Sequence, residues 1–467
     1  MLSMSENYEE NVRGFASLLR TDENFDILER HLLIGTERMA LYYIDGLTKD
    51  GDLQKLMQFF LNTGEIGTAQ AFLLRLPYVE AEIADAPDRL ATAVLSGQTV
   101  LFAEKFGARA VVLDLRHYPT RSLSEPESDK VMQGARDGFL ETLAVNTVLI
   151  RRRIRDVRLT MEHHTLGGSS QTDVVLCYMK GVADPARVKA IADKIASIHP
   201  RSVTLGFQSL AESLIRRGWW NPFPKIRTTE RPDTAAAQIM EGSILVLCDT
   251  SPQAMILPTS LFDYLQQTDD YYFPPLTGTY LRLVRTLILI LSVFSTSLWY
   301  LALQYADALP PMFSFLIPAE PGQLPILAQI YLAELAIDGL KIASMNTPDM
   351  LSNSLSVVGA LVLGDFAIGV GWFCQDVILY MAFVAIANFA QQNHELGYAF
   401  KFMRMLILAL TAALGAPGFF VGLILFCFFA AANPTLDGSR HYLYPLIPFN
   451  GKALLRLLFR MKKQDVD

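Results

Sequence analysis

The chain divides into a region that carries charge throughout and a region with long charge-free stretches. Residues 286–306, 377–394 and 405–436 contain no Asp, Glu, Lys or Arg, whereas residues 1–280 hold no comparable run. A helix needs about 18 or more apolar residues to cross a hydrocarbon core of roughly 30 Å. We therefore predict a water-soluble N-terminal region followed by a compact membrane domain.

Composition narrows the class of protein further. A length of 467 residues suits two or three domains, and a net charge of −7 argues against a nucleic-acid partner, which needs a basic surface. The four cysteines are far apart and form no CxxC pair, so we expect no disulfide framework, metal site or cofactor. The acidic N-terminus lacks the apolar segment of a signal peptide.

Basic residues near the apolar stretches predict the orientation in the membrane. Arg282 and Arg285 precede the first stretch, residues 307–325 contain no Lys or Arg, and a basic tail follows the last stretch. We therefore place the N-terminal region and the tail in the cytoplasm. Four crossings agree with this but put Lys401 and Arg404 outside. A fifth crossing at residues 326–344 places Lys401 inside but the basic tail outside. The tail stays inside if residues 405–432 turn back at the Gly415–Gly418 break. Both counts stay open.

The soluble region shows alternating strand and helix patterns, including a strand at residues 99–102 and a helix at residues 138–154. The predicted fold is an α/β region of two subdomains followed by an all-α polytopic membrane domain. The predicted boundaries are an N-terminal segment (1–24), subdomain 1 (25–120), subdomain 2 with its linker (121–280), the membrane domain (281–440) and a basic tail (441–467).

Charged residues in subdomain 2 are candidates for contacts between subdomains or with partners. An arginine cluster at the end of the predicted helix faces either the negative helix terminus or a partner and lipid headgroups. Glu230 and Arg231 suit a pair between subdomains. No nucleophile–base pair, phosphate-binding loop or metal-ligand set accompanies these residues, so we predict that the protein is not an enzyme. The candidates are Arg136, Arg151, Arg152, Arg153, Glu230 and Arg231.

Two apolar segments carry charged residues that are candidates for function. Glu334 and Asp338 are four residues apart and share one helical face, which lies either inside a bundle or at the level of the headgroups. Segment 354–375 is rich in glycine. Four of its residues, two polar and two apolar, share one helical face because they follow each other at 4-3-4 spacing. That face suits a cation pore with an acidic ring; the alternative is that its carboxylate bonds to a neighbouring helix. The pore-lining candidates are Ser354, Val358, Leu361 and Asp365.

Several motifs, taken in chain order, resemble the A-type subunit of the spore germination GerA family. They are Glu125-Pro-Glu, Gly134-Ala-Arg-Asp-Gly-Phe, Leu149-Ile-Arg-Arg-Arg, Thr229-Glu-Arg-Pro-Asp and the C-terminal membrane block. The resemblance implies the inner membrane of a spore, contact with membrane lipid and with other integral germination proteins, and a homo-oligomer, a pentamer, that passes monovalent cations. Asp365 departs from the family pattern, in which an uncharged amide is commoner. A non-conducting scaffold or signalling subunit is the alternative function.

Overall fold

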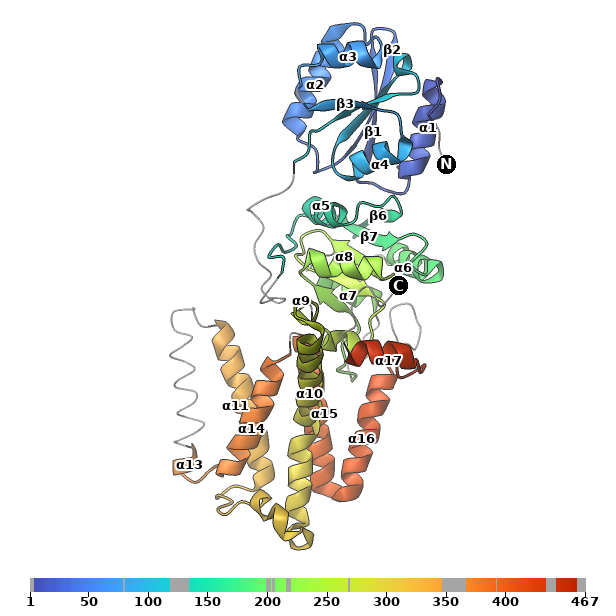
Figure 1. The fold of residues 1–467 in the computed structure, drawn as a ribbon. Helices are drawn as coiled ribbons and strands as arrows, with labels where there is room; N and C mark the ends of the chain where they lie inside the picture. Colours follow the sequence, from blue (N-terminus) through green and yellow to red (C-terminus); the bar gives the residue numbers. More distant parts are fainter. Residues whose placement is uncertain are drawn as a thin grey trace. The chain divides into compact units, whose positions relative to one another are not determined.

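The structure is a computed structural model that describes residues 4–78, 80–117, 134–198, 203, 206–215, 220–267, 269–346, 367–391, 393–433 and 442–459. It falls into two compact units. Unit 1 comprises Met1–Arg217, Ile226–Thr259 and Leu436–Gly438, and unit 2 comprises Gly218–Lys225, Ser260–Thr435 and Ser439–Asp467. Most residues before Ser260 thus belong to unit 1, and the apolar C-terminal part of the sequence belongs largely to unit 2 (Figure 1).

The first half of unit 1 is an antiparallel sheet covered by helices on both faces. Its strands are ordered β1-β2-β4-β5-β3. Helices α1 and α4 pack on one face around Phe15, Tyr42 and Phe102, and α2 and α3 pack on the other around Phe60 and Phe72. The elements are α1 (Tyr8–Leu19), β1 (Ile27–Ile34), β2 (Glu37–Ile44), α2 (Asp50–Thr63), α3 (Ala69–Arg75), β3 (Ala81–Ala84), α4 (Pro87–Leu95), β4 (Thr99–Ala103) and β5 (Ala110–Leu113).

The second half of unit 1 has the same construction. Its antiparallel sheet is ordered β6-β7-β9-β10-β8, with α5 and α8 on one face and α6 and α7 on the other. The elements are α5 (Leu143–Arg153), β6 (Leu159–Leu166), β7 (Thr172–Met179), α6 (Pro185–Ser197), α7 (Phe207–Leu214), β8 (Arg227–Thr229), α8 (Pro232–Met240), β9 (Ile244–Cys248) and β10 (Ala254–Leu257). The predicted mixture of helices and strands is thus present, with every strand pair antiparallel.

The two halves follow one element order, αββααβαββ, and one strand order. The sequence also repeats at α4 and α8. Pro87-Asp88 and Pro232-Asp233 open these helices, and Gly97 and Gly242 follow ten residues after each proline with φ of 95° and 96°. Proline fits the first helical turn, and glycine adopts positive φ without strain. Unit 1 therefore consists of two copies of one fold.

Unit 2 is helical throughout its described residues. Its long helices lie side by side, and short elements connect them (Figure 1). The elements are η2 (Leu261–Leu265), α9 (Asp269–Tyr272), α10 (Pro275–Gln304), η3 (Ala306–Ala308), η4 (Pro311–Leu316), α11 (Ile326–Asn346), α13 (Ala367–Gly369), α14 (Gln375–Phe389), α15 (His394–Leu414), α16 (Ala416–Ala431) and α17 (Gly451–Leu458).

The apolar segment 405–432 is a helical hairpin. Helix α15 ends at Leu414. The next residue, Gly415, reverses the chain with its φ of 66°, and α16 returns along α15. Gly418 and Gly422 of α16 lie against Leu410 and Ile407 respectively. A Cβ atom at Gly418 would lie 1.9 Å from the Leu410 carbonyl oxygen, so only glycine permits this approach. Of the interpretations left open above, the turn back is the one found.

Contacts between the other helices fix their directions. Ser292 and Gln304 of α10 meet Arg404 and Ala412 of α15, so these two helices run parallel. Tyr331 and Asp338 of α11 meet Met405 and Lys401 of α15, so α11 runs the opposite way. The side chain of Gln329, near the start of α11, accepts the N–H of Cys374 at the start of α14. Figure 1 shows the two helices side by side from these starts, so α11 and α14 are parallel.

Two described helices, α10 and α15, are long and apolar enough to cross a bilayer, while α14 and α16 are apolar but shorter. Many large apolar side chains on these helices point outward, among them Leu298, Leu379, Ile386 and Ile424. Outward apolar side chains on parallel and antiparallel helices are expected where lipid replaces water as the solvent.

Candidate functional site

Four charged side chains meet inside the helical bundle of unit 2. Glu334 and Asp338 of α11 face Lys401 and Arg404 of α15. The Glu334 Oε1 atom accepts from Arg404 Nε at 2.7 Å, and Lys401 Nζ lies 3.4 Å from Glu334 Oε2 and pairs with Asp338. The side chains of Glu334, Lys401 and Arg404 are each less than one-tenth exposed. We call this group the charged quartet.

The quartet is electrically balanced and connects three helices. Its two carboxylates and two cations sum to zero net charge. Arg404 Nη1 also donates to the carbonyl oxygen of Ser292 on α10, at 3.2 Å, and Lys401 donates to the carbonyl of Glu334. Buried charges are tolerated when they are paired and hydrogen-bonded, and removal of one partner is costly. The quartet therefore holds α10, α11 and α15 in one arrangement.

Glu334 and Asp338 have different surroundings within the bundle. Glu334 lies inside the bundle, and Asp338 is partly exposed at its edge with a cation as partner. Lys401 and Arg404 caused the conflict between the two crossing counts. They are engaged with carboxylates inside the bundle, so they do not behave as loop charges that set orientation.

A second ionic group lies where α10 begins. Asp270 is fully buried and accepts from Arg282 Nε at 3.3 Å and from Arg285 Nη2 at 3.1 Å. Arg282 Nη1 also donates to the carbonyl oxygens of Arg456 and Leu457 in α17, at 3.1 and 2.9 Å. Cations commonly bond the last carbonyls of a helix, and here one side chain ties α17 to the start of α10.

A short loop segment of the soluble region belongs to the helical unit. The chain leaves unit 1 after Arg217 and returns at Ile226. Between these points Phe223 is buried against Phe400 and Phe426, and Asn433 donates to the carbonyl oxygen of Pro224 at 3.2 Å. Segment 220–225 is therefore packed into unit 2 although α7 and β8 on either side of it belong to unit 1.

Arg151 joins the two halves of unit 1. Its guanidinium is fully buried and donates from Nε and Nη2 to the two carboxylate oxygens of Asp26, each at 2.9 Å. Asn24 accepts from Arg151 at 3.3 Å and from the N–H of Met161 at 2.9 Å. Bidentate Arg–carboxylate pairs are strong and directional. This pair fixes α5 of the second half against the start of β1 in the first.

The other charged candidates of unit 1 have different surroundings. Arg153 pairs with Asp137, and the buried Arg231 donates to Asp233 and to the carbonyl of Ala135. Glu230 accepts from Gln253. The side chains of Arg136 and Arg152 are exposed. These contacts lie within the second half of the unit, and the pairing of Glu230 and Arg231 between subdomains remains a prediction.

The pore-lining candidates Ser354, Val358, Leu361 and Asp365 lie outside the described residues. Within the described part of segment 354–375, Gly371 accepts the N–H of Gln323 on its carbonyl oxygen, at 2.8 Å. This bond joins the loop before α11 to the loop before α14. The pore-lining role of the four residues remains a prediction.

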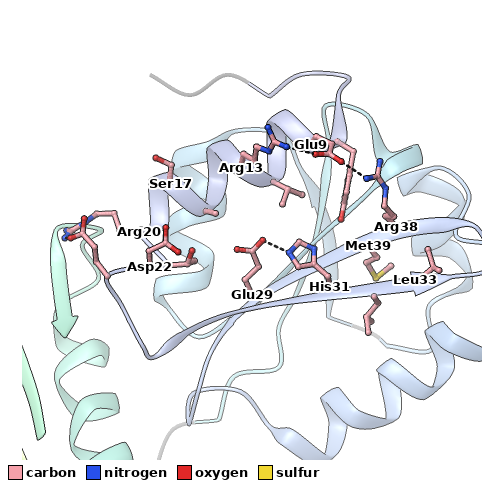
Figure 2. Close-up of a pocket in the computed structure, with 16 residues that line it drawn as sticks. Glu9, Arg13, Ser17, Arg20, Asp22, Glu29, His31, Leu33, Arg38 and Met39 are labelled. Atoms are coloured by element: carbon pink, nitrogen blue, oxygen red, sulfur yellow. Dashed lines mark hydrogen bonds and ion pairs between the residues drawn. The ribbon is translucent and has the colours of Figure 1, made fainter. Parts of the chain in front are cut away.

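A shallow groove of about 880 Å³ lies between α1 and the outer strand β1. Figure 2 shows Glu9 between Arg13 and Arg38, and His31 directed toward Glu29 on the same strand. These ionic groups are engaged with one another, and the groove supports no catalytic assignment. Among the residues that the structure describes, His, Cys, Asp and Glu form no cluster of three able to hold a metal ion.

The chain matches the family described as Bacillus/Clostridium GerA spore germination protein over residues 16–467. It belongs to the GerA spore germination family. This is a germination receptor family and not an enzyme family. The chain is thus an A-subunit-like membrane protein, in agreement with the resemblance of its motifs and with its apolar helices.

Individual relatives cover nearly the whole chain. The chain is 35% identical to stage V sporulation protein AF of Bacillus subtilis (strain 168), over 98% of this chain and 96% of that protein. It is 27% identical to the uncharacterized membrane protein YfkQ of the same organism, over 90% and 83% of the two chains. It is 26% identical to spore germination protein KA, also of that organism, over 93% and 81%.

A solved structure resembles the N-terminal region. It is the crystal structure of the N-terminal domain of the A subunit of the Bacillus megaterium spore germinant receptor GerK3. The match has a TM-score of 0.42 and 25% sequence identity, and it covers 55% of this chain and 96% of that one.

Sequence reasoning found the acidic half of the quartet and missed its basic half. Lys401 and Arg404 were considered only as signals of orientation. The available signal was their spacing. Two basic residues, three apart, directly precede one charge-free stretch, and two acidic residues, four apart, lie within another apolar segment. Charges within apolar segments usually pair with each other. Asp26 and Phe223 gave no such signal, because their partners lie more than 100 residues away in sequence.

Proposed function

We propose that this protein is a multi-pass membrane subunit in spore germination that assembles into an oligomeric channel for monovalent cations. Family membership supports the process. The observation that carries the proposal is the charged quartet buried among apolar helices, because ionisable groups at such positions commonly mark ion pathways or the elements that gate them.

The helix directions support a membrane domain that crosses six times. Of the five long described helices, α10 and α15 run in one direction, and α11, α14 and α16 run in the opposite direction. The span predicted from the sequence for segment 354–375 would add a sixth crossing, between α11 and α14. Six crossings place the N-terminal region and the C-terminal tail on one side, which is the cytoplasmic side by the distribution of Lys and Arg.

The interior of the bundle is polar at further positions. Thr296 and Ser297 of α10 are buried, and their hydroxyl groups have no hydrogen-bond partner among the described residues. Buried hydroxyls without protein partners fit a hydrated interior. In the proposed channel the predicted face with Ser354 and Asp365 lines the axis of a ring, a pentamer, while the quartet positions α10, α11 and α15 around it.

Unit 1 serves as the assembly and gating part of the proposed channel. Its two halves are joined by the Arg151–Asp26 pair, and the chain passes from it into the bundle through segment 220–225. A shift of the second half would therefore act through Phe223 on α15 and α16, which this side chain contacts. Other integral germination proteins are the proposed partners, and the inner membrane of the spore is the proposed location.

A non-conducting scaffold is the second candidate, and one observation favours it. Each charge of the quartet has a partner within the quartet, as expected for a structural interlock. In this alternative the helices only anchor unit 1 beside its partners.

Cation release from vesicles separates the two candidates. The purified full-length chain is placed in vesicles loaded with potassium, beside the Asp365→Asn variant and the control Asp307→Asn, which changes an exposed loop carboxylate. The channel predicts potassium release by the native chain and by the control, with reduced preference for cations over anions in Asp365→Asn. Unchanged selectivity in Asp365→Asn removes that residue from the pore. An oligomer that releases no potassium supports the scaffold.

A further inference from the structure

The C-terminal segment 442–459 exposes an unusual amount of apolar surface. Its side chains Tyr444, Leu446, Ile447, Phe449, Leu455 and Phe459 are all among the exposed large hydrophobic residues, and Phe449 is 73% exposed. Soluble surfaces rarely expose so many apolar groups together, and such patches mark contacts with proteins or membranes. The segment thus needs an apolar partner.

Helix α17 has the composition of a helix that lies in a membrane surface. Lys452 and Arg456 are exposed and four residues apart, so they share one face, and leucines occupy the other directions of the helix. The sequence continues with Arg460, Lys462 and Lys463 and contains no acidic residue between positions 438 and 464. Basic residues beside an apolar face favour a surface that carries anionic lipid headgroups.

The depth of α17 follows from its attachment to α10. Arg282 donates to the carbonyl oxygens of Arg456 and Leu457, and it precedes the charge-free stretch that starts at Thr286 by four residues. At 1.5 Å per residue this is about 6 Å along the helix, which is about the thickness of one headgroup layer. Figure 1 shows α17 lying across the direction of α10 and α16 instead of along it.

We propose that segment 442–459 binds the anionic lipid surface of the membrane that holds the bundle. Leu455 and Phe449 enter the boundary between headgroups and acyl chains, and Lys452 and Arg456 contact lipid phosphates. The inference rests on the proposed multi-pass topology. It adds a lipid-binding surface outside the membrane-crossing helices, which do not need this surface to span the bilayer.

Bromine quenching of a fluorophore tests the proposal in the full-length chain. Cys427 is replaced by alanine, and the other three cysteines are buried. Single cysteines at Leu455, Phe449, Lys452 and, within α10, Leu298 are labelled with a nitrobenzoxadiazole dye. The protein is placed in phosphatidylcholine vesicles with or without phosphatidylglycerol, in which the lipid chains carry bromine at shallow or deep positions. All four side chains are exposed, so labelling leaves the fold intact.

The proposal predicts that shallow bromines quench the dye at Leu455 and Phe449 severalfold more than at Lys452. Phosphatidylglycerol should increase this quenching, and the double variant Lys452→Gln/Arg456→Gln should abolish the increase. Equal quenching at Leu455 and Lys452, or none at Leu455 with a blue-shifted emission that shows a protein cover, overturns it. Quenching unaffected by phosphatidylglycerol overturns the recognition of anionic lipid.

The dye at Leu298 separates this inference from the proposed topology. Deep bromines should quench it whether or not α17 binds lipid. Quenching at Leu298 without quenching at Leu455 leaves the crossing helices in place and contradicts only the lipid surface. No quenching at Leu298 contradicts the membrane topology itself.

Discussion

Glu334 on α11 and Arg404 on α15 form a buried ion pair 70 residues apart in sequence, with 2.7 Å between Oε1 and Nε. The pair lies between helices whose outer faces are apolar, and the same guanidinium holds the Ser292 carbonyl of α10. Three helices of the bundle thus depend on one arginine.

Glu334→Gln should destabilise the helical unit. The change leaves Arg404 and Lys401 with Asp338 as the single carboxylate of the quartet, and loss of one partner of a buried pair costs about 3–5 kcal/mol. Thermal unfolding of the detergent-solubilised chain measures the effect. The control Glu320→Gln removes an exposed carboxylate and should change stability by less than about 0.5 kcal/mol. Equal melting temperatures for both variants would show that the pair is not buried.

Gly418→Ala should loosen the α15–α16 hairpin. A methyl group there would meet the Leu410 carbonyl oxygen, and overpacking of this kind costs about 1–3 kcal/mol. Gly397→Ala in α15 is the matched control, since no neighbouring atom lies within 4 Å of its Cβ position. The control should be neutral or stabilising by up to about 1 kcal/mol, because alanine favours helix. Melting temperatures compare the two, and a stable Gly418→Ala variant contradicts the close approach.

Asp26→Asn should separate the two halves of unit 1. It removes the charge that Arg151 faces in a fully buried position, so we expect a loss of about 3–5 kcal/mol. Hydrogen exchange of the intact chain, followed by mass spectrometry, should show faster exchange in α5 and at the start of β1. Glu82→Gln, which breaks an exposed pair with Arg89, should leave exchange unchanged. Identical exchange in both variants argues against a role for Asp26 in joining the halves.

Acid should weaken a second contact between the halves. Hydrogen bonds from Arg20 and then Lys180 lower the pKa of Glu23 from 4.5 to about 2. Because the folded pKa is the lower one, the stabilisation is complete above pH 4.5 and disappears as the pH falls to about 2. Glu23 is 42% exposed, so solvent screening keeps the effect below about 1 kcal/mol. Unfolding of native and Glu23→Gln chains between pH 2 and 7 should differ most above pH 4.5 and converge at pH 2; a constant difference contradicts the assignment.

Local sequence patterns correctly predicted elements whose start and end do not depend on distant contacts. The strand expected at residues 99–102 is found as Thr99–Ala103, since an apolar run between turns suffices to predict a buried strand. Strand β1 escaped notice because it is an outer strand with Glu29, Arg30 and His31 at its centre. Charges are common on such strands and hide the apolar alternation.

Long-range contacts account for the other differences. The helix expected at residues 138–154 begins at Leu143. The Asn146 side chain bonds both main-chain groups of Leu140, and Asp249 accepts the N–H of Leu143 at 3.0 Å. Asp249 lies 106 residues further along the chain, so local spacing could not reveal this start. The partners of Glu334 and Asp338 lie 63 to 70 residues away, and only the general tendency of charges in apolar segments to pair pointed to them.

Potassium release from vesicles that carry Glu334→Gln, Arg404→Gln or both changes tests most directly whether the quartet-bearing bundle conducts. The native quartet has no net charge, the single variants leave +1 and −1, and the double variant restores zero. A conducting bundle predicts release by the native chain, altered release in each single variant and recovery toward the native rate in the double variant. Absence of release from an intact native oligomer, or equal release by all four chains, would contradict the proposed channel or the part that the quartet plays in it.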